Sequence, residues 1–310
     1  MVLRQLEYLV ALAREKHFGR AALACNVSQP TLSAAIRQLE ADLGAPIVER
    51  GQKFHGLTQQ GRAVLEHAHR ILAEADALRR NLEEMDKGLS GRLRFGAVPT
   101  ALPIISHITG PFHARFPNVT VTVLSLTSQE IQRGIDDFEL DVGLTYLDNE
   151  PLDNVLAKPI YAEEYVFLTP AHGPYAGRET ITWREAADAP LCLLTPDMQN
   201  RRVIDGIFRS VGVQPKPSVE TNSIFNLCSH ASSGHWSSIA PRQLLQFFGT
   251  PRGTLAVELV EPQARRTIGM IMSNRAPPSP LARNLFAMDY PKDIARRVEP
   301  PIRLLDAGAM

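Results

Sequence analysis

The chain has 310 residues, more than one typical domain holds, so we expect two or three compact units, each with its own core. Lysine plus arginine number 33, as do aspartate plus glutamate. The formal net charge is therefore zero. The chain lacks the overall excess of basic residues that would by itself indicate a nucleic-acid-binding or membrane-surface protein. That average conceals an asymmetry. Residues 1–62 hold eight basic and five acidic side chains, so the N-terminal end is net positive and the remainder net negative.

No stretch has the composition of a targeting or membrane-spanning segment. The first residues, MVLRQLEYLVALAREKHF, are interrupted by charges, and no apolar run approaches the roughly 18 residues that cross a bilayer. The three cysteines, Cys25, Cys192 and Cys228, are far apart and odd in number, which indicates neither a disulfide framework nor a metal-ligand cluster. We therefore expect a cytoplasmic protein without a metal or cofactor.

Three short helices are predicted at the N-terminus. Apolar residues recur at helical spacing over 3–15, small residues fill a second helix over 19–24, and a third helix follows Ser28 and ends at Gly44. Ser28 can cap this helix, and Pro30 lies in its first turn, where a missing N–H costs nothing. Two extended pieces over 46–57, around a turn at Gly51, indicate a β-wing. This order predicts an all-α winged helix-turn-helix over residues 1–57.

The third helix begins with SQPTLSAAIRQLE at residues 28–40, which joins a polar first turn to an apolar face. The N-terminal turn of a recognition helix enters the major groove, where base edges offer hydrogen-bond donors and acceptors. The alternative is that Ser28 is only an N-cap and that Gln29 and Thr31 are solvated. The candidate DNA-binding residues are Ser28, Gln29, Pro30, Thr31, Ser33 and Arg37 on the helix, and Arg50 and Lys53 on the wing.

A long helix is predicted over residues 58–90. Its apolar residues alternate in steps of four and three for more than three repeats, a pattern typical of a helix packed along a partner helix. The alternative is a helix that lies on the core of its own domain. The apolar seam consists of Val64, Ala68, Ile71, Ala75, Leu78, Leu82, Met85 and Leu89.

From residue 91 the pattern changes to strands that alternate with helices. The βαβαβ order over 92–145 predicts a parallel sheet, and further strands and helices follow over 164–260 and 268–290. We expect an α/β domain over 91–310 with two lobes joined by crossing strands. Lobe I would comprise about 91–162 and 267–292, and lobe II about 163–266.

This arrangement resembles the LysR-type transcriptional regulators. The most specific match is residues 3–62, including LTQQGR at 57–62, with further marks in FHARFPNVTV at 112–121 and LDVGL at 140–144. The resemblance implies a winged helix-turn-helix, a dimerising linker helix and an effector domain like a periplasmic binding protein. It also implies double-stranded operator DNA as a partner, tetramers, and contact with RNA polymerase. Residues 229–241, SHASSGHWSSIAP, depart from the family's glycine-rich turn.

The resemblance also places a small-molecule effector between the lobes. In βαβ units ligands lie at the carboxyl ends of the strands, and helix N-termini there favour anions. A small carboxylate or another small anion is the expected effector, and the chain is similar to regulators of formate-metabolism operons. As an alternative, Thr100 and Ser128 are ordinary N-caps. The candidate effector-binding residues are Pro99, Thr100, Ala101, Ser128, Thr195, Met198, Gln199 and Asn222.

Parts of the sequence also fit two other classes of protein. A Ser/His cluster over 229–235 invites a hydrolase interpretation, but no G-x-S-x-G elbow, phosphate-binding glycine loop or H-E-x-x-H accompanies it. The two-lobed domain alone would suit a solute-binding protein for transport. The predicted DNA-binding module argues against that class. Cys228 could sense oxidants, but a structural thiol is the simpler interpretation because no resolving cysteine lies near it in sequence.

Overall fold

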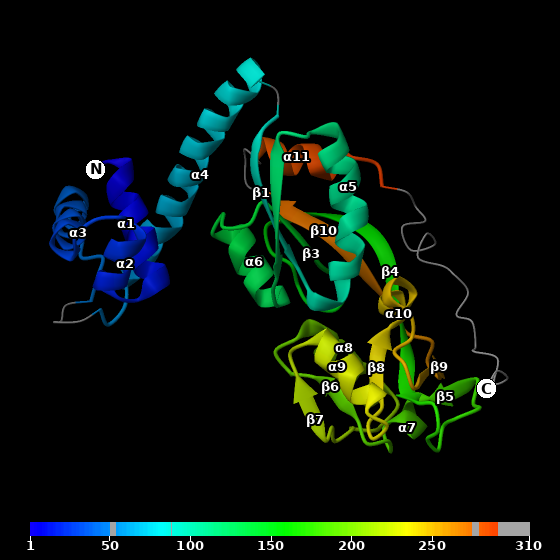
Figure 1. Ribbon diagram of the computed structural model, residues 1–310. Coiled ribbons are helices and arrows are strands. Elements are labelled where there is room, and N and C mark those ends of the chain that lie inside the picture. Colours follow the sequence, from blue (N-terminus) through cyan, green and yellow to red (C-terminus); the bar gives the residue numbers. More distant parts are fainter. Residues whose placement is uncertain (50–53, 88, 275–278, 291–310) are drawn as a thin grey trace. The chain divides into compact units, whose positions relative to one another are not determined.

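The computed structural model describes residues 1–49, 54–87, 89–274 and 279–290, with the backbone alone over 79–87 (Figure 1). The chain divides into two compact units, Met1–Ser90 with Asp137–Glu139, and Gly91 onward without those three residues. No helix in the described ranges is long and apolar enough to cross a membrane. The two wing candidates Arg50 and Lys53 lie outside the described residues.

Three helices form the core of the first unit: α1 (Leu3–Glu15), α2 (Phe18–Ala24) and α3 (Gln29–Leu43). Ala21 and Ala22 of α2 are buried, and their small side chains let α2 lie close to its neighbours. Gly44 ends α3 with φ of 66°, a left-handed conformation that glycine adopts without steric cost. The core consists mainly of Leu6, Leu9, Leu12, Ala21, Ala22, Leu32, Ile36, Leu39 and Ile47.

The segment after α3 returns antiparallel to itself, as a wing requires. Val48 and Leu57 form an antiparallel bridge, and Thr58 then caps α4 (Gln59–Lys87) by accepting the Gly61 N–H on its hydroxyl at 2.8 Å. A Cβ on Gly61 would lie 2.0 Å from the Ile47 carbonyl oxygen. Glycine is therefore required where α4 crosses the wing segment, which explains the glycine of LTQQGR.

Only part of the apolar seam on α4 packs within its own unit, and pairing of the rest with a partner helix stays a prediction. Val64 and the fully buried Ala68 pack on the core of the first unit, as the alternative interpretation expected. Ile71 and Leu78, seven residues apart, are exposed, the latter by 62%. Leu82 and Met85 lie where side chains are not described. The exposed pair leaves the seam available to a partner helix.

The second unit is built on a strongly mixed sheet. Strands follow the order β2-β1-β3-β10-β4-β9-β5, with β8 also paired to β4, and β6 and β7 form a separate pair. The parallel βαβαβ start comprises β1 (Gly91–Ala97), β2 (Val119–Ser125) and β3 (Val142–Tyr146). The other strands are β4 (Val155–Pro170), β5 (Thr180–Thr182), β6 (Cys192–Leu194), β7 (Val219–Thr221), β8 (Ser238–Pro241), β9 (Thr254–Val260) and β10 (Arg265–Ser273).

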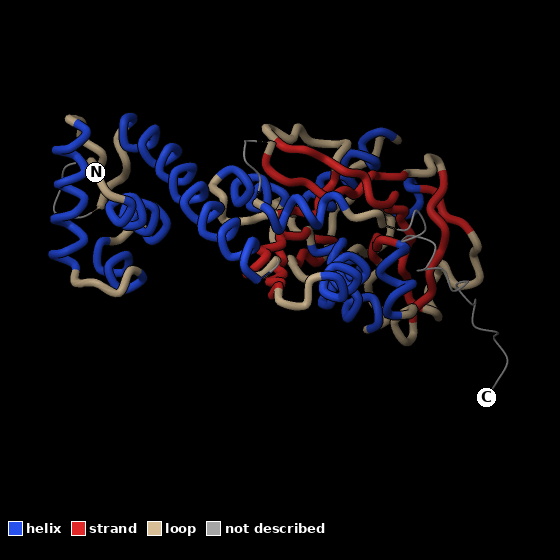
Figure 2. Tube along the Cα trace, turned by 90° about the horizontal axis from the view of Figure 1, so that it is seen from above, coloured by secondary structure: helices blue, strands red, loops and turns tan. Residues whose placement is uncertain are grey.

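Strands β4 and β10 are the crossing strands. β4 pairs with β10 over its first part and with β8 and β9 over its last part, so one continuous strand belongs to both lobes. Figure 2 shows the long strands of this unit in red. The predicted lobe boundaries at 162–163 and 266–267 fall inside these two strands. The lobes are therefore tied by β-structure rather than by flexible linkers.

The helices of the second unit follow the strands. The first helical segment, between β1 and β2, begins as a 3-10 helix, Pro99–Ile104, and continues as α5 (Ile105–Arg115). Pro103 lies inside the 3-10 helix, and its missing N–H disfavours an α-helical start. The remaining helices are α6 (Ser128–Asp136), α7 (Trp183–Ala186), α8 (Gln199–Ser210), α9 (Ile224–Ser232), α10 (Arg242–Phe248) and α11 (Pro280–Ala287).

Candidate nucleic-acid interface and ligand-binding cleft

The first turn of α3 exposes the polar side chains that the sequence singled out. Ser28 Oγ accepts the Thr31 N–H at 3.3 Å and lies 2.8 Å from Thr31 Oγ1, so Ser28 is an N-cap. Gln29, Pro30 and Thr31 are exposed, and Arg37 Nη1 donates to Ser33 Oγ at 3.1 Å. The opposite face of α3 is buried in the core. Capping therefore coexists with an exposed polar surface, and DNA contact by these residues remains a prediction.

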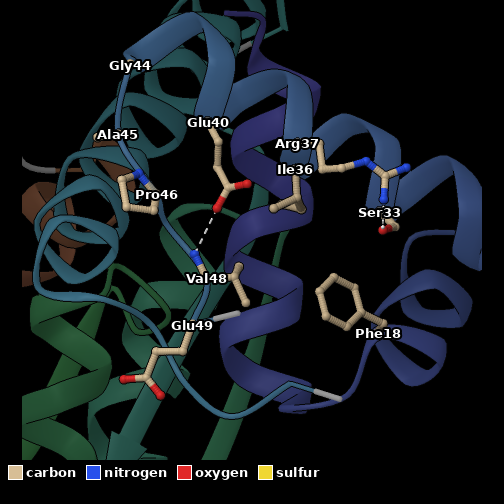
Figure 3. A pocket seen from close by; sticks show the side chains of 10 residues that line it. All are labelled: Phe18, Ser33, Ile36, Arg37, Glu40, Gly44, Ala45, Pro46, Val48 and Glu49. Carbon is tan, nitrogen blue, oxygen red and sulfur yellow. Dashed lines mark hydrogen bonds between the residues drawn. The ribbon is translucent and has the colours of Figure 1, made fainter. Parts of the chain in front are cut away.

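An open groove of about 820 Å³ runs beside α3, between that helix and the start of the wing (Figure 3). Ser33 and Arg37 line it from α3, and Phe18 lines it from α2. Glu40 crosses it, accepting the Ile47 N–H at 2.8 Å and the Val48 N–H at 3.1 Å on Oε1. This carboxylate fixes the wing segment to α3. Sequence reasoning missed it, since a glutamate on a helix carries no local signal for so distant a partner.

The sequence patterns also failed to predict how α2 is capped. The N-cap of α2 is His17, whose Nδ1 accepts the Gly19 N–H at 3.1 Å and the Arg20 N–H at 3.3 Å. Histidine is not among the preferred capping residues, so propensity gave no indication. The cap sets the entry into α2, whose alanines support α3.

The centre of the second unit holds a buried polar cluster. Tyr146 at the end of β3 donates its hydroxyl to Glu163 Oε1 at 2.5 Å, and Asn200 Nδ2 donates to the Tyr146 oxygen at 2.9 Å. Thr100 Oγ1 lies 3.2 Å from the same oxygen. Thr100 is 1% exposed and Glu163 is fully buried. The predicted residue Thr100 is thus engaged inside the protein, and its partners were not foreseen.

Burial dominates the electrostatics of this cluster. Removal from water raises the pKa of Glu163 to about 7, although the hydrogen bond from Tyr146 acts in the opposite direction. Glu163 Oε2 and Tyr165 Oη are buried and make no hydrogen bond among the described residues. Burial and the neighbouring Glu163 charge raise the pKa of Tyr146 well above its ordinary value, so the phenol remains a donor. A carboxyl group that changes charge near neutral pH therefore lies where β4 passes between the lobes.

Two further contacts tie α8 of lobe II to lobe I. Arg202 donates to both oxygens of Glu150, at 2.6 and 3.0 Å, and its Nη2 donates to Ser128 Oγ at 3.1 Å. Gln199 accepts from the Thr145 hydroxyl at 3.0 Å and donates to Asn149 Oδ1 at 2.7 Å. Ser128 and Gln199, both predicted from sequence, therefore take part in contacts between the lobes. These contacts depend on the tertiary fold, so local sequence patterns do not predict them.

The remaining predicted residues divide between a cavity and the interior. Pro99 and Asn222 line a cavity of about 280 Å³ between the lobes. Ala101 is fully buried, and Met198 packs in a cluster with residues of α9 and α10. Thr195 Oγ1 is buried and makes no hydrogen bond within the described ranges. The other cavity-lining residues include Leu102, Pro103, Ile224, Phe225, Leu244 and Phe248.

An exposed polar helix in a winged helix-turn-helix, joined to a two-lobed α/β domain with an interlobe cavity, defines a ligand-responsive DNA-binding regulator. Residues 3–62 match the family described as bacterial regulatory helix-turn-helix protein, lysR family, and residues 86–288 match the LysR substrate binding domain. The chain therefore belongs to the LysR family of DNA-binding transcriptional regulators, which confirms the resemblance. It is a regulator and not an enzyme.

Similar proteins include several named as hydrogen peroxide-inducible genes activators. The chain is 29% identical to the DNA-binding transcriptional dual regulator OxyR of Escherichia coli K12 over 278 residues, covering 89% of this chain and 91% of the relative. It is 30% identical to the uncharacterized regulator YnfL of the same organism over 244 residues, covering 77% and 82%. Neither is named for formate, so that narrower similarity stays a prediction.

Solved structures share the fold over nearly the whole chain. Full-length OxyR from Pseudomonas aeruginosa, a cysteine-to-aspartate variant, superposes with a TM-score of 0.70 at 27% identity, covering 96% of this chain and 95% of that one. CbnR in complex with its target DNA superposes with a TM-score of 0.64 at 22% identity, covering 96% and 100%. The predicted fold class, a winged helix-turn-helix followed by a two-lobed α/β domain, is confirmed.

Proposed function

We propose that this regulator reads operator DNA through the first turn of α3 and responds to a small anion that competes for the interlobe contact of Arg202. The observation that carries the proposal is the position of Arg202, which joins α8 to both Ser128 and Glu150. The capped, exposed first turn of α3 supports the DNA-reading part. The same part of the proposal is supported by a solved structure of similar fold, CbnR in complex with its target DNA.

Each side chain on α3 has a role that its chemistry permits. Gln29 can pair with an adenine edge, and the Thr31 methyl group can contact a thymine methyl. Ser33 with Arg37 can reach a base or a phosphate from the groove wall. Arg50 and Lys53 on the wing supply phosphate contacts, which add salt-dependent affinity without sequence choice.

A carboxylate effector could replace Glu150 on the Arg202 guanidinium. A guanidinium binds a carboxylate through two parallel hydrogen bonds, the geometry that Glu150 now occupies. An anion that took this place and also accepted from Ser128 would free the Glu150 segment and change how the lobes meet. Because a ligand shifts a conformational equilibrium only by its differential affinity, this exchange provides the required difference between the two states.

We propose that two copies of the chain pair through α4. Ile71 and Leu78 are exposed apolar residues seven positions apart, as a helix needs to pair with a second copy. Dimers through this helix, and tetramers formed from them, would bring two or four modestly basic DNA-binding domains to one operator. We place the protein in the cytoplasm, where it would meet RNA polymerase at the promoter.

The cysteines do not favour a thiol sensor, although several relatives are named as hydrogen peroxide-inducible genes activators. Burial, with the neighbouring Cys228, raises the pKa of the fully buried Cys192 to about 11. Burial also raises the pKa of Cys228 and of Cys25. Because the thiolate is the form that reacts with peroxide, all three thiols are poorly suited to this role. The effector we propose is therefore a bound molecule.

The test is DNA binding by the full chain, followed by ligand titration. Labelled fragments that tile the intergenic DNA around the gene would be titrated with protein at fixed salt, with and without a panel of small carboxylates. We expect one fragment to bind far more tightly than the others, and one carboxylate to change its footprint in the wild type but not in Ser128→Ala. Equal binding of all fragments at every salt concentration would contradict the DNA-reading part.

A further inference from the structure

The cavity between the lobes is lined mainly by apolar side chains, in contrast to the polar contacts of Arg202. Pro99 and Leu102 of the 3-10 helix form one wall, and Leu244 and Phe248 of α10 form another, with Phe225 at the start of α9. Its volume is about 280 Å³. Specific small-molecule sites are typically concave and apolar with few polar groups, and this cavity has that character.

Two of its lining phenylalanines are unusually exposed. Phe225 is 75% and Phe248 is 65% exposed, and their ring centroids lie 6.2 Å apart. Large apolar side chains that share an exposed patch indicate an interaction site. Removing an exposed phenylalanine side chain from water is favourable, so an apolar occupant would gain from both rings. No comparable gain is available to a small hydrated anion.

We propose that this cavity binds a ligand with a single apolar ring, which lies beside Phe225 and Phe248. The site is separate from the anion site of the proposed function, because Arg202, Ser128 and Glu150 do not line the cavity. A cavity of about 150 Å³ accommodates benzene in another protein, so 280 Å³ here suits one ring with a short substituent. Asn222, Ser223 and Ser125 are the polar residues of the lining, and they can meet one polar group of the ligand.

The position of the cavity links its occupancy to regulation. Its walls come from both lobes, because the 3-10 helix follows β1 whereas α9 and α10 belong to lobe II. A ring between these walls would contact both lobes at once and favour the arrangement in which they lie together. A concave space of this size suits a small molecule, whereas a stable protein partner would have to bury at least about 1,000 Å².

The experiment titrates full-length protein with three probes at equal ionic strength: benzoate, benzyl alcohol and formate. Binding would be measured by calorimetry in the wild type and in the double variant Phe225→Ala, Phe248→Ala. Both residues are exposed, so their truncation leaves the core intact. Leu156→Ala, at a 40% exposed apolar residue of β4, serves as the matched control.

We expect benzoate to bind the wild type more tightly than formate does, and the double variant to weaken benzoate at least tenfold while Leu156→Ala leaves it unchanged. Benzyl alcohol binding that is lost in the same double variant would also support the ring. The ring proposal would be overturned if formate bound as tightly as benzoate and the double variant weakened neither ligand. If that binding were lost in Ser128→Ala, the proposed anion response would stand. Absence of binding by all three probes and by the carboxylate panel would overturn both.

Discussion

Tyr146 and Glu163 share a 2.5 Å hydrogen bond at the buried centre of the effector domain, and this bond joins the end of β3 to the strand that crosses both lobes. The bond does not compensate for burial, because the pKa of Glu163 is raised to about 7. Stability of this domain should therefore depend on pH through one side chain.

Folding stability should fall with rising pH, because the folded chain holds the Glu163 proton more tightly than the unfolded chain does. Between the ordinary glutamate pKa, 4.5, and about 7, the unfolded chain has released the Glu163 proton while the folded chain retains it. Folding stability from this group is thus present below about pH 4.5 and is lost as pH rises through 7. The loss is on the order of 3 kcal/mol. Glu163→Gln should remove this component and make the variant more stable than wild type at pH 8.

Tryptophan fluorescence in urea can measure this change. The two tryptophans, Trp183 and Trp236, both lie in the effector domain, so their emission reports that domain within the full chain. Parallel pH profiles of stability for wild type and Glu163→Gln between pH 4.5 and 8 would show that Glu163 does not titrate in this range.

Removing the Arg202 side chain should loosen the contact between the lobes. Arg202→Met leaves Glu150 and Ser128 without their shared donor, at a cost of about 1–3 kcal/mol. Hydrogen exchange should accelerate at the start of α8 and around Glu150. Arg209→Met, at an exposed position in the last turn of the same helix, is the control. Equal exchange rates in the two variants would exclude Arg202 as an interlobe tie.

Gly61 should be intolerant of any side chain. A Cβ there would lie 2.0 Å from the Ile47 carbonyl oxygen. The backbone fixes the position of a Cβ, and the oxygen belongs to the backbone, so no side-chain rotation can separate the two atoms. Gly61→Ala should destabilise the DNA-binding domain by at least about 2 kcal/mol, visible as an earlier thermal transition. Gly110→Ala, on α5 with nothing within 4 Å of the added Cβ, should instead stabilise its own domain slightly. Similar melting of Gly61→Ala and wild type would contradict the packing.

The thiols should resist peroxide. Titration of the denatured protein with a thiol reagent should count three free cysteines both before and after brief treatment with a few equivalents of hydrogen peroxide. The reason is burial, which holds the pKa of Cys192 near 11 and raises that of Cys228. Loss of two thiols together with altered DNA binding would instead indicate a redox sensor.

Local sequence patterns were sufficient for most of the fold. Ser28 as a cap, the apolar face of α3 and the alternation of strands and helices depend on near neighbours in the chain, and these predictions agree with the structure. The extent of β4 was missed, because its first half pairs with β10, more than 100 residues later. Pairing at that distance leaves no local periodicity.

The ligand site was less predictable for the same reason. Thr100 and Ser128 begin helical segments, which a sequence pattern can indicate, but their partners Tyr146 and Arg202 come from distant elements. Phe225 and Phe248 were not foreseen as cavity residues, since an aromatic residue on a short helix ordinarily packs in a core. Only the fold brings α9 and α10 opposite the 3-10 helix.

The central claim is that the first turn of α3 reads DNA sequence. Two glutamines on that helix provide a matched pair: Gln29 lies in the exposed first turn, and Gln38, nine residues later, faces nearly the opposite direction and pairs with Asp42. The decisive measurement is the affinity of wild type, Gln29→Ala and Gln38→Ala for the best-bound upstream fragment and for a scrambled fragment.

We predict that Gln29→Ala lowers affinity for the upstream fragment by about 1–3 kcal/mol and leaves the scrambled fragment unaffected, while Gln38→Ala binds both as wild type does. Gln29→Ala protein that binds the upstream fragment as tightly as wild type, with the same footprint, would contradict the claim.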